Sequence, residues 1–336
     1  MTSERDPKAE SESPSLGRHR RSSSYHLSAY AFVGLLLASA VFFSIYPETS
    51  DTFPTDANIQ TLVSSNSVIA IIALAALVPL VAYEFDLSVG AIAGLSSIFV
   101  ADALSNGTPI PLAIGLGIAI GASVGVINAL LITQARVNAV ITTLGTSIII
   151  AGVINMKTEG SAITGNIADS FTDFGTGTTF GIPRPAFAMV VVAGLVYYML
   201  VHTPYGRYLY AFGSNRAAAA LVGIRTNFVL GMTFVISGTI AGAAGVLQVA
   251  RAGSADPRVG ETFTLPALAA AFLSAAAIKP GRYNVGGTLV AIFFLAVLNS
   301  GLNLAGAPEY IASYVNGAAL IIGVALAVRL GGRAEL

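Results

Sequence analysis

The sequence predicts an all-α polytopic membrane protein with about ten transmembrane helices. Of its 336 residues, 54% are apolar and only 10% are charged, and its mean hydropathy is +0.76. Soluble domains carry about 25% charged residues. Apolar runs long enough to cross a hydrocarbon core, which takes about 20 residues, recur along the whole chain. The composition therefore excludes a soluble globular protein.

Cysteine and tryptophan are absent, and the 17 basic residues balance the 17 acidic ones. The lack of cysteine excludes disulfides, thiolate metal sites and cysteine nucleophiles. A net charge of zero gives no indication of nucleic acid as a partner.

Residues 1–28 are polar and rich in Ser, Glu and Arg, which predicts a disordered cytoplasmic tail. This leader is too long for a secretory signal, so we expect the first apolar run to be retained. Residues 29–330 are predicted to form the transmembrane domain, and residues 331–336 a short cytoplasmic tail.

Hydropathy places ten spans on the chain. They are residues 29–46, 62–82, 87–104, 110–133, 138–156, 185–202, 227–250, 264–279, 284–305 and 310–328. Polar residues interrupt the sequence at Asp86 and within 138–156. Either region is expected to be a continuous span or to contain a broken or re-entrant segment.

The basic residues indicate which ends of the spans face the cytoplasm. With the amino terminus inside, 13 of the 17 Lys and Arg residues fall in cytoplasmic segments. Positive charge accumulates on the cytoplasmic side of membrane proteins. Ten spans also return the carboxyl terminus to the cytoplasm, so both termini are predicted to be cytoplasmic.

The spans also suggest internal symmetry. Spans 2–5 and 7–10 form two blocks that begin on opposite sides of the membrane, and Asn128 and Asn299 lie in similar short segments of the two blocks. These features predict an inverted repeat, which places a pathway at the midplane between the halves. Glycines recur every four residues at Gly117, Gly121 and Gly125 and again at Gly238 and Gly242, which predicts closely packed helices.

Polar side chains inside the spans are candidates for function, because an amide in hydrocarbon is costly unless it has a partner or lines a wet cavity. Each acts either as a contact between helices or as a lining of the pathway. They are Asn128, Asn155, Gln248, Asn299 and Asn303.

The loop 203–226 contains three arginines and no acidic residue, which predicts that it is cytoplasmic. Asn215 can cap a short helix over residues 216–222, and Gly223 can end it in a left-handed conformation. So short a helix needs a surface to pack on. Its apolar stripe is Ala217, Ala220, Leu221 and Ile224. The loop either docks on its own protein or docks a cytoplasmic partner.

The chain contains no GxxxxGK[ST] phosphate loop, no HExxH and no GxSxG motif. Asp86 and Asp102 fall near span ends, so the spans contain no chain of carboxylates for proton coupling. We therefore expect no enzymatic activity and no energy source in this chain. A transporter of this kind would need a partner that hydrolyses nucleotide, which favours the docking interpretation of the loop.

Five motifs carry a resemblance to a known family. Residues 206–215 read GRYLYAFGSN and resemble the cytoplasmic loop of ribose, xylose and galactose type ABC transporter permeases. Four further stretches match motifs of this family in order and spacing. They are DLSVG at 86–90, VN at 137–138 with TLGT at 143–146, GR at 281–282 with GT at 287–288, and LNSGLNL at 298–304. The resemblance covers about residues 60–328.

The resemblance implies a membrane-spanning permease subunit of an ATP-binding-cassette importer in a bacterial plasma membrane. It implies a dimer with a second permease copy or paralogue, two cytoplasmic ATPase subunits, an extracytoplasmic solute-binding protein and a monosaccharide as substrate. ATP and magnesium would sit on the ATPase, with no cofactor or metal in this chain and no nucleic acid as a partner.

The family's coupling role then falls on one set of loop residues. They are Gly206, Arg207, Tyr210, Gly213, Asn215, Arg216, Ala217, Ala218, Leu221 and Gly223. A gating or structural role falls on a second set, which is Asp86, Ser88 and Gly90. Together with Asn128, Gln248, Asn299 and Asn303, this set makes up the candidates for gating or for the pathway.

Some positions depart from the family pattern. Glu84 and Phe85 stand where the family has two glycines, Pro280 replaces the first glycine of a turn, and residues 274–278 are more apolar than usual. The last change leaves the solute open, with branched-chain amino acids, nucleosides and autoinducer-2 as alternatives. An ion-coupled secondary transporter and a non-transporting membrane scaffold are alternatives from other classes.

Overall fold

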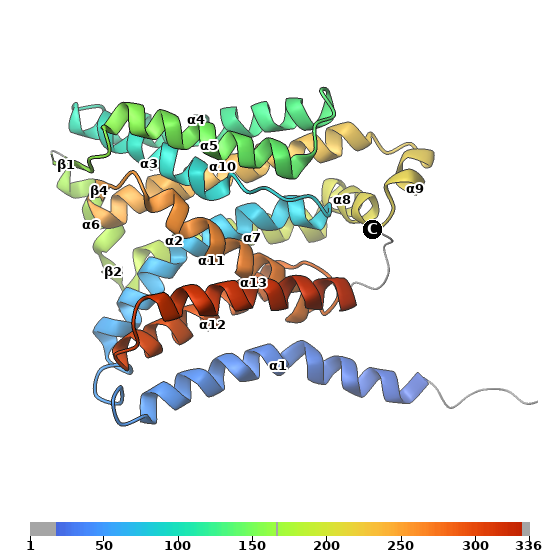
Figure 1. Ribbon diagram of the computed structural model, residues 1–336, viewed down its shortest axis with the longest axis horizontal. Helices are drawn as coiled ribbons and strands as arrows, with labels where there is room; N and C mark the ends of the chain where they lie inside the picture. The colour runs from blue at the N-terminus through green and yellow to red at the C-terminus, as the bar shows by residue number, and fades with distance from the viewer. Residues whose placement is uncertain (1–17, 166, 331–336) are drawn as a thin grey trace, which may run out of the picture.

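The computed structural model describes residues 18–330 except residue 166. Over this range the expected spans coincide with ten long helices (Figure 1). They are α1 (Arg18–Ile45), α2 (Asp56–Val81), α3 (Val89–Ser105), α4 (Ile110–Thr133), α5 (Ala139–Thr158), α7 (Arg184–His202), α10 (Thr226–Ala252), α11 (Val259–Leu273), α12 (Val285–Leu304) and α13 (Tyr310–Leu330).

Shorter elements connect the long helices. They are α6 (Asp169–Thr176), α8 (Pro204–Ser214), α9 (Arg216–Leu221) and the 3₁₀ turn η1 (Ser274–Ala276), with strands β1 (Ile163–Thr164), β2 (Thr178–Thr179), β3 (Ile182–Pro183) and β4 (Ser254–Ala255). β1 pairs with β4 and β2 with β3, both antiparallel. The described chain is thus almost entirely helical, as the composition predicts.

Within the described residues, seven helices are long and apolar enough to cross a membrane by themselves. These are α2, α4, α5, α7, α10, α12 and the run of α11 with η1, whereas α1, α3 and α13 contain shorter apolar stretches. The chain is therefore a multi-pass membrane protein.

The structure differs from the expected boundaries at α1 and at α11, which begins at Val259 and ends at Leu273 where a span over 264–279 was expected, and it decides the two regions that the sequence left open. Helix α1 begins at Arg18, so residues 18–28 of the predicted tail continue the first helix, because extending an existing helix fixes only one residue per new hydrogen bond. The polar run 138–156 is a continuous helix, capped by Asn138. At Asp86 the chain leaves the helical conformation over residues 82–88. Residues 1–17 and 331–336 of the predicted tails lie outside the described residues.

Helices α2 and α10 form the centre of the bundle. Every residue of α2 from Ala70 to Val81 is buried. α3 and α4 pack on α10, whereas α11 and α12 pack on α2. α2 ends, and α10 begins, at the side of the bundle where α8 and α9 lie, so the two helices run in opposite directions (Figure 1). The helices that follow α2 thus pack on α10, and those that follow α10 pack on α2. This is the arrangement expected of the predicted inverted repeat of α2–α5 and α10–α13.

The turns before α3 and α11 show the same symmetry in their backbones. Ser88 has φ −91 and ψ −7, and Arg258 has φ −92 and ψ −8. Asp86 accepts a hydrogen bond from the Ser88 amide at 2.9 Å, and Asp256 accepts one from the Arg258 amide at 2.7 Å. The motif Asp-x-x-Val-Gly therefore occurs at the same place in both blocks, at the start of the second helix of each.

The predicted close packing of glycine helices is found between α4 and α10. A Cβ added at Gly121 would overlap the carbonyl oxygen of Gly238, and one added at Gly238 would overlap that of Gly121. On the same helix, a Cβ at Gly115 would meet nothing within 4 Å. Small residues thus let these two backbones touch, as expected where packing replaces the hydrophobic effect.

Candidate coupling and translocation site

The loop 203–226 folds into two short helices joined at Asn215. Thr203 caps α8 by accepting a hydrogen bond from the Gly206 amide at 3.2 Å. Asn215 caps α9 by accepting one from the Ala218 amide at 2.9 Å, and Gly223 follows with φ +86. The predicted cap and stop are confirmed, whereas α8 is a helix that was not expected from the sequence.

The apolar stripe predicted on α9 does not pack on the bundle. Ala219 is buried instead, whereas Ala217, Ala220 and Leu221 are exposed, with Leu221 at 88%. Of the four predicted stripe residues, only Ile224 packs against the core. Helix α9 meets the bundle through Ala219, and the chain just beyond it through Ile224, so most of its apolar surface faces outward. The loop therefore packs on its own bundle through α8 and Ala219, and leaves the predicted stripe of α9 free.

Helix α8 is fixed firmly to the bundle. Leu209 and Phe212 are buried. A Cβ added at Gly206 would overlap the carbonyl of Leu200 on α7, and one at Gly213 would overlap the carbonyl of Val81 on α2. Gly206 and Gly213 are therefore contact points between the loop and the spans, while Arg207 is exposed.

Side chains of α8 and α9 reach the non-helical segment 82–88. The Arg216 guanidinium lies 3.7 Å from the Glu84 carboxylate and 5.1 Å from the centre of the Phe212 ring. Burial raises the pKa of Glu84 above its ordinary value, and the charge of Arg216 opposes that shift. The pair therefore joins α9 to the segment that leads to Asp86.

A second set of contacts reaches the break between α11 and α12. The Tyr210 hydroxyl donates to the Tyr283 carbonyl at 3.0 Å, and the Tyr210 ring lies 5.5 Å from the Arg282 guanidinium. Tyr283 in turn packs edge to face on Tyr83. The two short helices thus contact both interruptions of the helical bundle.

Asp86, Ser88 and Asn128 meet in one buried polar network. Asp86 is 1% exposed, and its carboxylate accepts hydrogen bonds from the Ser88 hydroxyl at 2.6 Å and the Ser237 hydroxyl at 2.8 Å. Asn128 donates to the Ser88 hydroxyl at 3.0 Å and accepts from Thr146 at 2.7 Å. The network ties α3, α4, α5 and α10 together. For Asn128, this geometry fits a contact between helices better than a pathway lining.

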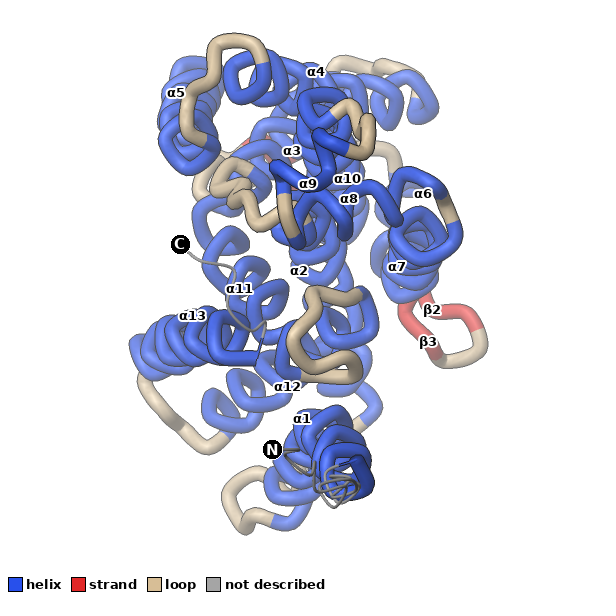
Figure 2. Tube along the Cα trace, turned by 90° about the vertical axis from the view of Figure 1, so that its right-hand side faces the viewer, coloured by secondary structure: helices blue, strands red, loops and turns tan. Residues whose placement is uncertain are grey.

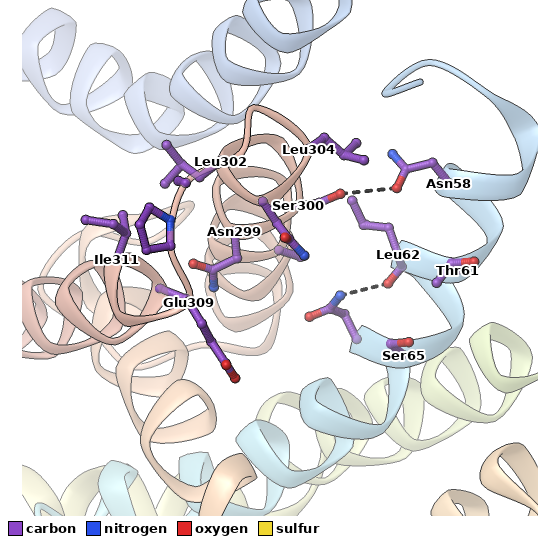
Figure 3. A pocket seen from close by; sticks show the side chains of 16 residues that line it. Asn58, Thr61, Leu62, Ser65, Asn299, Ser300, Leu302, Leu304, Glu309 and Ile311 are labelled. Atoms are coloured by element: carbon purple, nitrogen blue, oxygen red, sulfur yellow. Dashed lines mark hydrogen bonds between the residues drawn. The ribbon is translucent and has the colours of Figure 1, made fainter. Parts of the chain in front are cut away.

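Gln248, Asn299 and Asn303 lie at the other end of the bundle, whereas Asn155 is exposed on α5. Gln248 accepts hydrogen bonds from Arg251 at 3.3 and 3.4 Å, and Arg251 also donates to Ser65 at 3.2 Å. Asn299 and Asn303 line a cavity of 580 Å³ between α2, α12 and the turn before α13 (Figure 3). The structure therefore separates Asn128 from this amide pair.

Sequence reasoning missed the wall of this cavity that α2 supplies. Asn58, Thr61 and Ser65 line it, together with Asn66. Their spacing of three and four residues places them on one face of a helix. That spacing is visible in the sequence and could have identified this wall. It was overlooked because residues 56–61 precede the apolar run from which the span was predicted.

Comparisons with known proteins agree with this architecture. The family model described as branched-chain amino acid transport system / permease component matches residues 58–324. The ribose import permease protein RbsC of Escherichia coli (strain K12) is 33% identical over 292 residues, which cover 86% of this chain and 91% of that protein. The D-allose transport system permease protein AlsC of the same organism is 31% identical over 296 residues, covering 88% and 90%.

A solved structure shows the same fold. It is an inward-facing conformation of a metal-chelate type ABC transporter, with a TM-score of 0.52 and 14% sequence identity. The match covers 90% of this chain and 97% of that chain.

Proposed function

The chain belongs to the branched-chain amino acid transport system / permease component family, and from that premise we propose that it is the membrane-spanning subunit of an ABC importer for a monosaccharide. The proposed substrate class is that of ribose, xylose and galactose. A separate subunit supplies the energy, and ATP and magnesium belong to that subunit. This chain transports and has no enzymatic role of its own.

The exposed apolar face of α9 carries the proposal. Leu221 and Val222 are 88% and 77% exposed, although the Asn215 cap and the buried Ala219 hold the helix in one position. A fixed apolar surface of this kind at the end of a bundle is typical of a protein-binding site. We assign it to a cytoplasmic ABC ATPase, because the loop contains Arg207, Arg216 and Arg225 and no acidic residue.

This assignment fixes the orientation that we propose. The end with α8 and α9 faces the cytoplasm of a bacterial plasma membrane, and both termini lie on that side. The opposite end, where α2 begins and α12 ends, faces the outside and receives an extracytoplasmic solute-binding protein. A second permease copy or paralogue completes the transporter.

The contacts of α8 and α9 supply a route for coupling. A push on α9 from the ATPase reaches Glu84 through Arg216. Through α8, which is joined to α9 at Asn215, it reaches Tyr283 by way of Tyr210. Both receiving segments are non-helical, and hinges are formed by a few loop residues that absorb changes in φ and ψ. We propose that these two breaks move when access alternates between the two sides.

The names of the relatives support the substrate class. The two similar permeases described above import ribose and D-allose by their names. Branched-chain amino acids, nucleosides and autoinducer-2 remain alternatives within the superfamily, and a panel of solutes separates them.

Reconstitution tests the function. The chain is placed in proteoliposomes with its co-expressed ATPase and solute-binding protein, and uptake of labelled pentoses, hexoses, leucine and a nucleoside is measured. We expect sugar uptake that requires ATP on the side of the membrane where the ATPase lies. This uptake should continue when an ionophore removes the ion gradients. Uptake that persists without ATP and collapses with the ionophore would instead show a secondary transporter, and absence of any flux would favour a scaffold.

A further inference from the structure

A polar cavity lies at the end of the bundle opposite α8 and α9. Helix α2 joins the two ends, because Val81 contacts α8 through Gly213 while Asn58 lines the cavity (Figures 1 and 3). The volume of 580 Å³ falls within the range of about 300–1,000 Å³ that is usual for small-molecule sites. In the orientation proposed above, this cavity faces the outside.

The polar groups that line the cavity are amides and hydroxyls from two helices. Those used in the argument are Asn58, Ser65, Asn66, Asn299, Ser300 and Asn303. Figure 3 shows the groups of α2 facing those of α12 across the cavity, where the Ser300 hydroxyl donates to Asn58 at 3.2 Å. None of the 16 lining residues is Lys, Arg or His, and Glu309 is the one acidic residue among them.

One of these groups is short of a hydrogen bond. The Asn299 amide nitrogen donates to Asn316 at 3.3 Å, but its side-chain oxygen is buried and has no partner within the described part of the chain. A buried acceptor without a partner costs about 1–3 kcal/mol.

We propose that the cavity is an extracytoplasmic subsite for a neutral polyhydroxylated solute, a monosaccharide. The proposal rests on the proposed function, which sets the side that the cavity faces. A sugar hydroxyl both donates and accepts, and so does a side-chain amide, so the two match without a charge on either. Leu62, Leu302 and Ile311 supply apolar wall for the carbon face of the ring.

The same lining disfavours charged solutes. An amino acid or a sugar phosphate would bring an anionic group into a cavity whose lining offers no cation and one carboxylate, Glu309. The guanidinium of Arg251 lies behind Ser65 and already donates to Ser65 and Gln248. Desolvating an unpaired charge is costly. The subsite therefore favours an uncharged sugar over a branched-chain amino acid, which carries a carboxylate.

The absence of cysteine from the chain gives a direct test. Ala307→Cys places a single thiol in the cavity wall, and Phe180→Cys places one at a 97% exposed position outside the cavity. In the full transporter in nanodiscs, without nucleotide, the rate of maleimide labelling is measured with D-ribose, D-allose, D-galactose, leucine or ribose 5-phosphate. At ten times its Kd, a bound sugar should slow labelling of the cavity thiol about tenfold, and the Phe180→Cys rate should stay unchanged.

Two further substitutions, each made in the Ala307→Cys protein, test whether the amides are needed for the sugar to protect the thiol from labelling. Asn299→Leu and Asn303→Leu should each abolish protection by the sugar, while Asn106→Leu, at the end of α3 and outside the cavity, should keep it. Asn303 is exposed, so its variant does not depend on repacking the core.

The outcomes separate this proposal from the function that it rests on. If no sugar slows labelling, or if protection survives both amide variants, the subsite is wrong even where ATP-driven sugar uptake is found. If leucine protects and sugars do not, the substrate class of the cavity is wrong. If sugars protect but the complex shows no ATP-driven uptake, the subsite stands and the proposed function fails.

Discussion

Gly90 of α3 and Gly260 of α11 lie backbone against backbone, each at the second position of its helix. A Cβ added at Gly90 would overlap the carbonyl oxygen of Gly260, and one added at Gly260 would lie 2.6 Å from the carbonyl oxygen of Gly90. The two glycines are equivalent positions of the inverted repeat, so the halves of the chain meet here. Gly90, a gating candidate from the sequence, is thus at the contact between the repeats.

This contact makes Gly90→Ala a test of the repeat interface. Ala is favoured over Gly in a helix by about 1 kcal/mol, but overpacking a contact costs about 1–3 kcal/mol, so we expect a net loss of stability. Gly152→Ala on α5 is the control, because its Cβ would meet nothing within 4 Å. Thermal melting of the purified protein measures both. A Gly90→Ala protein that melts at or above the wild-type temperature would contradict the contact.

The network around Asp86 predicts a graded effect of two substitutions. Asp86→Ala leaves the hydroxyls of Ser88 and Ser237 without their acceptor, and each buried unsatisfied group costs about 1–3 kcal/mol. Asp86→Asn keeps an acceptor and should melt between Asp86→Ala and the wild type. Asp102→Ala, which breaks a partly exposed ion pair with Lys157, should cost only about 0–1 kcal/mol. Equal melting temperatures for all three variants would show that the network around Asp86 does not stabilise the fold.

The geometry of α9 decides which substitutions test coupling. Gly213 lies against the Val81 carbonyl, so a bulky residue there disturbs the fold, whereas Ala218 and Leu221 are exposed. Ala218→Glu leaves the helix intact, because Glu at the third helical position completes a capping box. Loss of one interface anchor worth about 1.4 kcal/mol weakens binding about tenfold.

Because each substitution removes about one such anchor, we expect Ala218→Glu and Leu221→Asp to reduce ATP-driven uptake about tenfold or more. Insertion into the membrane and the melting temperature should stay unchanged. Ala135→Glu, an exposed position in the turn after α4, is the matched control and should retain uptake. Wild-type uptake by both α9 variants would defeat the coupling assignment.

Glu84 predicts a dependence of stability on pH. Burial raises its pKa in the folded state above the ordinary value of 4.5, although Arg216 opposes the shift. A carboxyl whose pKa is raised by folding stabilises the fold below its unfolded pKa, and this contribution is lost as pH rises through the folded pKa. Glu84→Gln should then match the wild type in acid and melt at a higher temperature in alkali.

Melting temperatures measured across a pH series check this expectation. The exposed Glu48→Gln serves as the control for the substitution itself. A constant difference for Glu84→Gln would show that the attraction to Arg216 balances the burial.

Local features of the sequence determined the positions of the helices. Apolar length placed all ten long helices, and the Asn215 cap and Gly223 stop placed α9, because hydropathy and capping act over a few neighbouring residues. The five motifs likewise indicated the family. The polar residue Asp86 also indicated the break in the apolar run, and residues 82–88 are not helical in the structure.

Only the tertiary structure decided what each side chain contacts. A membrane span is apolar on every side, so its sequence pattern does not distinguish the face that meets lipid from the face that meets another helix. For this reason the sequence left Asn128 and Asn299 as equals, whereas the fold buries Asn128 in a hydrogen-bonded network and places Asn299 in a cavity. The outward face of α9 was decided in the same way, because the packing of α8 on α2 and α7 fixes the direction in which Leu221 points.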